Sequence, residues 1–281
     1  MTYYHRRPTF NQRMSTINAF INDYIEDALR LSPEELATKS KSDTGYTFLH
    51  AIAGFTRDPT ILRDQIVGVL LAGRDTTAST LSFCLYELAR HPEVVAKLRR
   101  EILDTLGADG EPTYRNLKDM AYVKAVVNET LRLYPAVPYN MRVALKDTTL
   151  PRGGGPDGKK PVGVLKGMVI AYSTYIMQRR ADLYPAVSEN FAEINTFSPE
   201  RWEGWHPKGH EYVPFNAGPR ICVGQQFALT EMAYLLCRMF QKYETVENRM
   251  GPEGEGPMMR TDLTSKPAHP VLVAFFEPKE A

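Results

Sequence analysis

The stretch between Pro59 and Pro92 contains no proline, and it constrains the fold more than any other feature of the sequence. Asp58 followed by Pro59 is typical of a helix N-cap with proline in the first turn. The pattern therefore predicts a helix over about residues 59–90, well above the mean helix length of about 11 to 12 residues. Residues 67–73 in its middle are apolar nearly all round, which predicts a helix that runs through the interior of the protein.

Shorter helices and a small β region are predicted around this long helix. Apolar residues at three-and-four spacing indicate further amphipathic helices over about residues 17–29, 92–106, 123–134 and 225–243. Extended runs at residues 141–145 and 168–172 indicate a hairpin-like β region, and residues 271–276 indicate a last strand. We interpret the glycine-rich segment 153–160 between the first two runs as a solvated turn. The predicted fold class is mainly α with a small β region, in a single domain over residues 1–281.

The composition excludes several classes of protein. Lys and Arg together number 34 and Asp and Glu 33, so the net charge of +1 is not that of a nucleic-acid binder. No apolar stretch approaches the roughly 20 residues that span a bilayer, so we expect no membrane span in a soluble chain. Three cysteines are too few for a disulfide framework or a tetrathiolate zinc site, which favours a reducing compartment.

Cys222 lies in a loop over residues 215–224 that leads into the predicted helix 225–243. Unpaired amides and the dipole at a helix N-terminus stabilise a thiolate, and Arg220 adds positive charge. Glycines in this loop permit tight turns and the close approach of a flat ligand, and Phe215 can cover the sulfur. From the residues alone, a thiolate here suits a nucleophile as well as a metal ligand, although no neighbouring motif supplies a positioned histidine.

The order Phe-x-x-Gly-x-Arg-x-Cys-x-Gly in residues 215–224 resembles the haem-binding signature of the cytochrome P-450 superfamily, the haem-thiolate monooxygenases. The resemblance implies the C-terminal, helix-rich part of that fold, with haem b as the cofactor and Cys222 as the axial iron ligand. It also implies that Arg142 and Arg220 bind the haem propionates, because guanidinium groups suit carboxylates. Phe215 and Gly73 are expected beside the haem.

Two further motifs are similar to a structural element of the same superfamily. Glu129 and Arg132 match its Glu-x-x-Arg helix, and Arg201 matches its later arginine motif. The resemblance implies that these three side chains form a buried, ion-paired triad with a structural role. Taken alone, a Glu and an Arg one helical turn apart are an ordinary surface pair worth a few tenths of a kcal/mol.

Residues 72–77 resemble the oxygen-activation segment of the superfamily. The resemblance implies that the Thr76 hydroxyl hydrogen-bonds bound oxygen and that Asp75 relays protons from solvent. It also places Ala72, Thr76 and Val137 against the substrate, near the iron. Taken alone, Asp-Thr-Thr within a helix is more often an ordinary polar patch.

Residues 72–78, 128–135 and 151–158 are similar to the fungal hydroxylases of n-alkanes and fatty acids. The resemblance implies a monooxygenase that inserts one oxygen atom from dioxygen into such a hydrophobic substrate. It implies an NADPH-dependent flavoprotein reductase as the partner that supplies electrons.

The resemblance covers the whole chain but only the later part of a family member, so we expect an N-terminally incomplete domain without the membrane anchor. Intact relatives are expected at the endoplasmic reticulum membrane, and this chain in the cytoplasm or at an unknown location. One alternative is a truncated, non-catalytic remnant that retains neither haem nor substrate. Another is a rearranging isomerase or dehydratase that needs no reductase, which Asp75 and Thr76 argue against.

Overall fold

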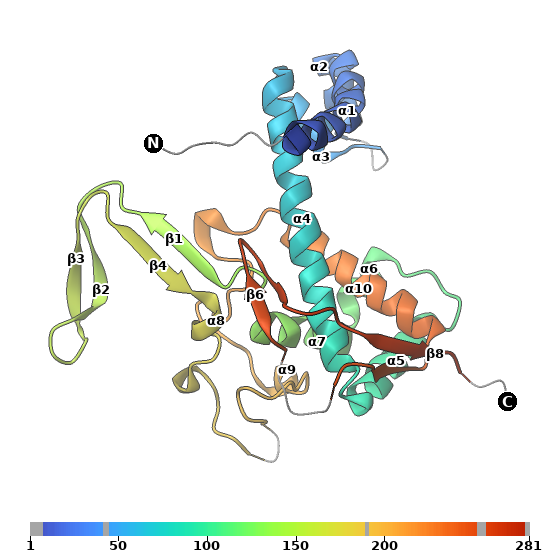
Figure 1. The fold of residues 1–281 in the computed structure, drawn as a ribbon, viewed down its shortest axis with the longest axis vertical. Helices are drawn as coiled ribbons and strands as arrows, with labels where there is room; N and C mark the ends of the chain where they lie inside the picture. The colour runs from blue at the N-terminus through green and yellow to red at the C-terminus, as the bar shows by residue number, and fades with distance from the viewer. Residues whose placement is uncertain (1–7, 42–44, 189–190, 252–256, 279–281) are drawn as a thin grey trace. The chain divides into compact units, whose positions relative to one another are not determined.

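Helices dominate the computed structural model, which describes residues 8–41, 45–188, 191–251 and 257–278 (Figure 1). The helical elements are α1 (Pro8–Arg30), α2 (Pro33–Lys39), α3 (Phe48–Ala53), α4 (Pro59–Leu88), α5 (Pro92–Leu106), α6 (Tyr114–Asp119), α7 (Ala121–Leu133), α8 (Thr174–Met177), η1 (Ala181–Leu183), α9 (Arg201–Gly204), η2 (Gly218–Arg220) and α10 (Gln225–Lys242). The strands are β1 (Tyr139–Val143), β2 (Thr148–Gly154), β3 (Lys160–Val164), β4 (Val169–Ser173), β5 (Thr245–Asn248), β6 (Met259–Thr261), β7 (Ser265–Pro267) and β8 (Val273–Phe276). The predicted fold class, mainly α with a small β region, is confirmed.

The chain divides into two compact units, one ending at Arg74 and the other beginning at Asp75, both within α4. In the first unit, α1 buries one face, on which Ile21 and Ile25 are 1% and 3% exposed, against α2, α3 and the start of α4. The interpretation of residues 1–281 as a single domain stays a prediction.

The long helix α4 begins at Pro59, as expected, and the Asp58 carboxylate caps it by accepting a hydrogen bond from the Thr60 amide at 2.8 Å. The expectation that its middle is buried is wrong for this structure, because Leu70 and Leu71 are 49% and 63% exposed. The core of the first unit reaches along α4 only as far as Val67, so it leaves the next turns uncovered. Neither α4 nor any other helix in the described part of the chain is long and apolar enough to cross a membrane.

The main core lies in the second unit, where α5, α7 and α10 pack with the C-terminal part of α4. Helix α7 is buried along nearly its whole length, from Tyr122 to Leu133. It ends directly before Tyr134-Pro135, because proline cannot continue a helix. This helix carries Glu129 and Arg132, so both side chains start from a rigid, buried element.

Four two-stranded antiparallel sheets account for the named strands among the described residues. β1 pairs with β4, which confirms the predicted hairpin-like region, with Asn140 opposite Tyr172 and Arg142 opposite Ile170. The segment interpreted as a solvated turn is confirmed as the exposed turn of a second hairpin, β2–β3, and only its ends, up to Gly154 and from Lys160, belong to the strands. Its residues are almost all exposed, so the hairpin lacks the apolar alternation on which a strand prediction relies.

Candidate haem-ligand loop and buried ion-pair cluster

The loop before α10 presents the Cys222 thiol at the surface. Its backbone is closed by the Cys222 amide, which donates to the Phe215 carbonyl at 2.8 Å, and Gly218 turns the chain with a φ of 66°. Phe215 packs against the main core, so it anchors the beginning of the loop. The loop therefore holds a free thiol two residues before Gly224, the N-cap of α10.

The surroundings of Cys222 combine exposed apolar surface with an unpaired cation. Ile221 is 54% exposed, Val223 88% and Phe227 71%. Arg220 is exposed and forms no ion pair or hydrogen bond with the residues that the structure describes. Within the same residues there is no cluster of three or more His, Cys, Asp or Glu side chains that could hold a metal ion.

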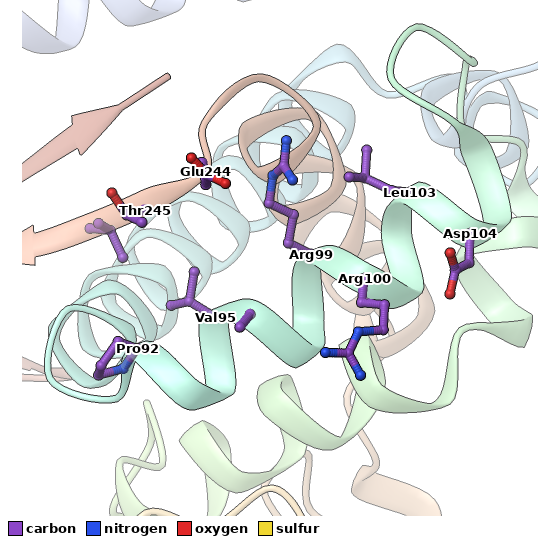
Figure 2. A pocket seen from close by; sticks show the side chains of 10 residues that line it. Pro92, Val95, Arg99, Arg100, Leu103, Asp104, Glu244 and Thr245 are labelled. Atoms are coloured by element: carbon purple, nitrogen blue, oxygen red, sulfur yellow. The ribbon is translucent and has the colours of Figure 1, made fainter. Parts of the chain in front are cut away.

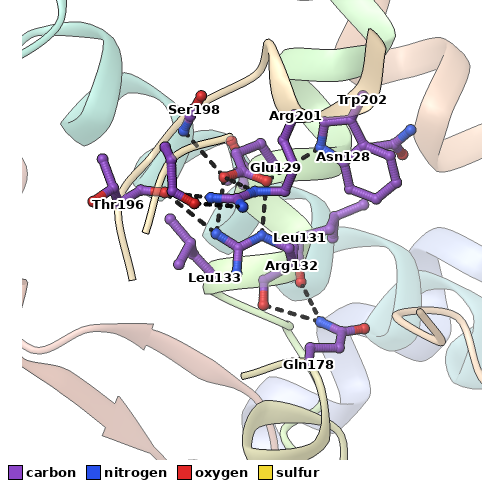
Figure 3. Close-up of polar contacts among 12 residues, drawn as sticks. Asn128, Glu129, Leu131, Arg132, Leu133, Gln178, Thr196, Ser198, Arg201 and Trp202 are labelled. Atoms are coloured by element: carbon purple, nitrogen blue, oxygen red, sulfur yellow. Dashed lines mark hydrogen bonds and ion pairs between the residues drawn. The ribbon is translucent and has the colours of Figure 1, made fainter. Parts of the chain in front are cut away.

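Glu129, Arg132 and Arg201 lie together in a fully buried cluster, in which each residue is at most 1% exposed (Figure 3). Arg132 donates from Nε to Glu129 Oε2 and from Nη2 to Glu129 Oε1, both at 2.8 Å. Arg201, which begins α9, donates from Nε to Glu129 Oε1 at 3.3 Å. The structure thus brings together all three residues of the expected triad.

Both carboxylate oxygens of Glu129 also accept bonds from neutral donors. The Ser198 amide donates to Oε1 at 3.0 Å and the Trp202 indole to Oε2 at 3.1 Å (Figure 3). Burial alone lowers the pKa of Arg132, but the hydrogen bonds and charge of Glu129 outweigh it and raise that pKa. These bonds to Glu129 hold the segment around α9 to α7.

Gln178 secures the C-terminal end of α7 from another side. It is fully buried, and its Nε2 donates to the carbonyls of Leu131 and Arg132 at 3.0 Å each (Figure 3). Its Oε1 accepts from the Val213 amide at 3.1 Å. This side chain therefore connects the helix of the ion-pair cluster to the residues that lead into the thiol loop.

Arg142 on β1 contacts the thiol loop through Asn216. Its Nη2 lies 3.5 Å from Asn216 Oδ1, and its Nη1 donates to the Met141 carbonyl at 2.9 Å. The Tyr172 hydroxyl on β4 donates to the same Asn216 oxygen at 2.6 Å. The structure thus connects one of the two predicted propionate arginines to the loop that carries the predicted iron ligand.

Asp75 and Thr76 are consecutive residues on α4, with Asp75 exposed and Thr76 half-buried. The helix continues without a break through this segment, and the Thr80 hydroxyl donates to the Thr76 carbonyl at 2.9 Å. Thr77 is buried, and its hydroxyl has no partner within the described part of the chain. Asp75 is therefore in contact with solvent, whereas Thr76 is partly shielded from it.

The remaining predicted residues lie on α4 and after α7. Ala72 and Gly73 are both exposed, and a Cβ atom added at Gly73 would meet open space. Val137 is half-buried and follows Ala136, whose carbonyl accepts a bond from the Ser265 amide at 2.8 Å.

A groove of about 460 Å³ lies elsewhere, between α5 and the start of β5 (Figure 2). Arg99, Arg100, Asp104 and Glu244 line it, together with mostly apolar side chains. It contains none of the predicted site residues, and its charges are mixed. We therefore do not identify it with the site defined by Cys222.

Sequence reasoning missed Asn216 and Tyr172 as contacts of the site. Asn216 is within the ligand-loop pattern but at a position where that pattern specifies no residue. Tyr172 belongs to a strand that was predicted, but its hydroxyl contact depends on tertiary structure. The exposed Phe227 was missed too, although an aromatic residue in the first turn after the loop is a visible signal.

A family profile described as Cytochrome P450 matches residues 5–270. The chain belongs to the cytochrome P450 family, a family of haem-binding oxidoreductases, and the expected family is thereby confirmed.

The similar curated proteins are fungal. Cytochrome P450 monooxygenase pvhE of Talaromyces variabilis is 61% identical over 275 residues, which cover 98% of this chain and 51% of that protein. Cytochrome P450 52A13 of Debaryomyces hansenii is 47% identical over 243 residues, covering 85% of this chain and 45% of that protein. The chain thus spans about half the length of the curated relatives it matches. A solved structure, the heme domain of a cytochrome P450DA mutant, matches with a TM-score of 0.65 and 28% identity, over 79% of this chain and 47% of that chain.

The residues around Cys222 fit the haem that the family implies. A single sulfur donor without further side-chain ligands suits a metal whose other ligands come from a cofactor ring. The exposed Ile221, Val223 and Phe227 suit an apolar ring, and the unpaired Arg220 suits its carboxylates.

Proposed function

We propose that the chain carries the iron-ligand segment of a haem-dependent monooxygenase. The reaction inserts one oxygen atom from dioxygen into a carbon–hydrogen bond of a hydrophobic substrate. The second oxygen atom leaves as water, with two electrons and two protons consumed. One observation carries the proposal: Cys222 is an exposed free thiol at the start of α10, in a chain of the cytochrome P450 family.

Cys222 would bind the iron of haem b, and Arg142 and Arg220 its carboxylates. Phe215 and Gly73 would lie beside it. When bound, the haem supplies the iron at which dioxygen is activated.

Asp75 and Thr76 would hold and move protons. The exposed Asp75 carboxylate takes up a proton from solvent, and the half-buried Thr76 hydroxyl passes it inward. Thr76 would also contact the substrate, together with Ala72 and Val137. Glu129 and its two arginines keep α7 and the α9 segment in place, so their role is structural.

An n-alkane or fatty acid is the proposed substrate class, and a flavoprotein reductase that oxidises NADPH is the proposed electron donor. The similarity of residues 72–78, 128–135 and 151–158 to fungal alkane and fatty-acid hydroxylases supports the substrate class. The name of the relative pvhE, a monooxygenase, supports the reaction class. The endoplasmic reticulum membrane is the proposed location of the intact relatives.

The first test is the spectrum of the purified protein with added haem, reduced and bound to carbon monoxide. A red-shifted thiolate band is expected, and its absence would overturn the proposal. Cys222→Ser should abolish the band, whereas the matched variant Cys237→Ala, in the buried core, should retain it.

The second test addresses the proton path. With reductase, NADPH and a panel of alkanes and fatty acids, Thr76→Ala should bind substrate normally but divert reducing equivalents to hydrogen peroxide. Ser82→Ala on the same helix, whose hydroxyl donates to the Ala78 carbonyl, is the matched control. Unchanged coupling of NADPH consumption to product in Thr76→Ala would contradict the assignment.

A further inference from the structure

Asn216 has a backbone conformation that side chains rarely adopt. Its φ is 64°, and among the residues that the structure describes it is the only one other than glycine with a positive φ. Asparagine tolerates this left-handed region better than most residues, because its short polar side chain can form local hydrogen bonds. The loop could have used glycine here, as it does at Gly218, so the side chain of Asn216 needs its own explanation.

That side chain uses both ends of its amide to contact the β1–β4 sheet. Oδ1 accepts from the Tyr172 hydroxyl at 2.6 Å and lies 3.5 Å from Arg142 Nη2, while Nδ2 donates to Asn140 Oδ1 at 3.2 Å. The Arg142 guanidinium also lies 5.5 Å from the centre of the Tyr172 ring. Asn140 and Tyr172 are directly opposite each other in the sheet, so all these contacts converge on one place.

The backbone of the same residue belongs to the thiol loop. The Asn216 amide donates to the Val213 carbonyl at 3.1 Å, and the preceding Phe215 carbonyl accepts from the Cys222 amide at 2.8 Å. Asn216 therefore joins the loop that presents the thiol to the sheet that presents the Arg142 guanidinium.

We propose that Asn216 and Tyr172 are positioning residues that hold Arg142 and the Cys222 loop in a fixed relation, so that both engage one flat, carboxylate-bearing ligand. The inference rests on the proposed function, in which that ligand is haem. Arginine has many rotamers in solution, and an arginine that is already held loses less freedom when it binds a carboxylate. Neither positioning residue needs to touch the ligand itself.

The experiment compares Tyr172→Phe with Tyr139→Phe. The first removes the hydroxyl donor but keeps the ring beside Arg142. The second removes a 59% exposed tyrosine hydroxyl that has no partner among the described residues of the same sheet. Tyr172→Phe should speed haem transfer to an acceptor apoprotein roughly threefold to tenfold, the change that corresponds to one hydrogen bond. Tyr139→Phe should leave the rate unchanged.

Two variants at position 216 separate the side chain from the backbone. Asn216→Gly keeps the left-handed conformation but loses every side-chain contact, so it should accelerate haem loss at least as much as Tyr172→Phe. Asn216→Asp keeps the oxygen that Tyr172 and Arg142 contact, so it should restore most of the retention. Equal haem loss in the Gly and Asp variants would overturn the inference.

Two readouts distinguish positioning from general stability. Without haem, amide hydrogen exchange in residues 215–222 should rise in Tyr172→Phe, while the free energy of unfolding changes little. With haem, Tyr172→Phe should matter less in an Arg142→Ala background, because part of its effect passes through that arginine.

The outcomes separate this inference from the proposed function. A wild-type protein without a thiolate band would overturn both the proposed function and the inference that rests on it. A wild-type band together with unchanged haem loss in Tyr172→Phe and Asn216→Gly would overturn the inference alone.

Discussion

The buried cluster around Glu129 and the loop around Cys222 differ in how their polar and charged side chains are partnered. In the cluster, both oxygens of the carboxylate have donors from the chain itself, and its side chain and those of Arg132 and Arg201 are hidden from solvent. In the loop, the thiol and the Arg220 guanidinium are exposed, without such partners among the described residues. The difference teaches that the carboxylate on which the buried cluster depends is satisfied by donors of the chain, whereas the groups proposed to bind a ligand are left available.

The largest effect is expected for a variant that disrupts the buried cluster around Glu129. Glu129→Ala leaves two buried guanidinium groups without their counterion, which should lower the free energy of unfolding by about 3–5 kcal/mol. Urea denaturation measures the loss. Asp182→Ala removes an exposed partner of Arg180 and should change the stability little. Similar stabilities for the two variants would show that the cluster has no structural role.

A second buried carboxylate extends the comparison. The Tyr134 hydroxyl donates to Glu87 Oε1, and both residues are buried. Tyr134→Phe leaves that acceptor without its donor and should cost about 1–3 kcal/mol by the same denaturation measurement. Tyr114→Phe, at a 59% exposed position, is the matched control and should match the wild type. A null effect at Tyr134 would mean that the hydrogen bond adds nothing to the fold.

Arg220→Gln should show the reverse pattern. Because Arg220 is exposed and without a partner among the described residues, the free energy of unfolding of the haem-free protein should not change. Haem affinity, measured by titration, should fall about tenfold to a hundredfold, as expected for the loss of a hydrogen bond to a charged group. A lower free energy of unfolding together with unchanged haem affinity would show that Arg220 stabilises the fold and does not bind the ligand.

The smallest effect concerns pH. Burial raises the pKa of Glu87 above its ordinary value of 4.5. The Tyr134 hydrogen bond and the charges of His91 and Arg90 lower this pKa by less than burial raises it, and the charge of Glu129 raises it further. The folded state thus binds this proton more tightly than the unfolded state does, so the resulting stabilisation is complete below about pH 4.5 and is lost as the pH rises through the folded pKa.

In the wild type, ionisation of Glu87 should lower the free energy of unfolding as the pH rises above 4.5. Glu87→Gln cannot ionise at this position, so its free energy of unfolding should fall less over the same range. Denaturation curves of the two proteins across that range give the comparison. Parallel pH profiles would mean that the Glu87 carboxyl has the same proton affinity in both states.

The long helices could be predicted because their signals are local. Pro92 begins α5 and Gly107 follows its end, both as the sequence indicates. The exposed middle of α4 could not be predicted, because apolar composition tells what a helix needs to bury but not which element covers it. The β2–β3 hairpin was missed because it is exposed and lacks an apolar face.

The site residues divide in the same way. Spacing alone puts Glu129 and Arg132 on one helix face, but Arg201 is 72 residues from Glu129, and only the family resemblance suggested their meeting. The left-handed conformation of Asn216 and its contacts to Tyr172 depend on the packing of a distant sheet, which no local pattern encodes.

The three cysteines differ in their expected reactivity toward thiol reagents. Burial raises the pKa of Cys84 and Cys237 to about 12, whereas Cys222 is exposed. An alkylating reagent at neutral pH should therefore label the folded chain at Cys222. Any molecule that covers this sulfur slows the labelling. The fraction of labelled Cys222, measured by mass spectrometry, therefore reports how much of the protein has a ligand at this loop, and the measurement needs neither an absorption spectrum nor enzymatic activity.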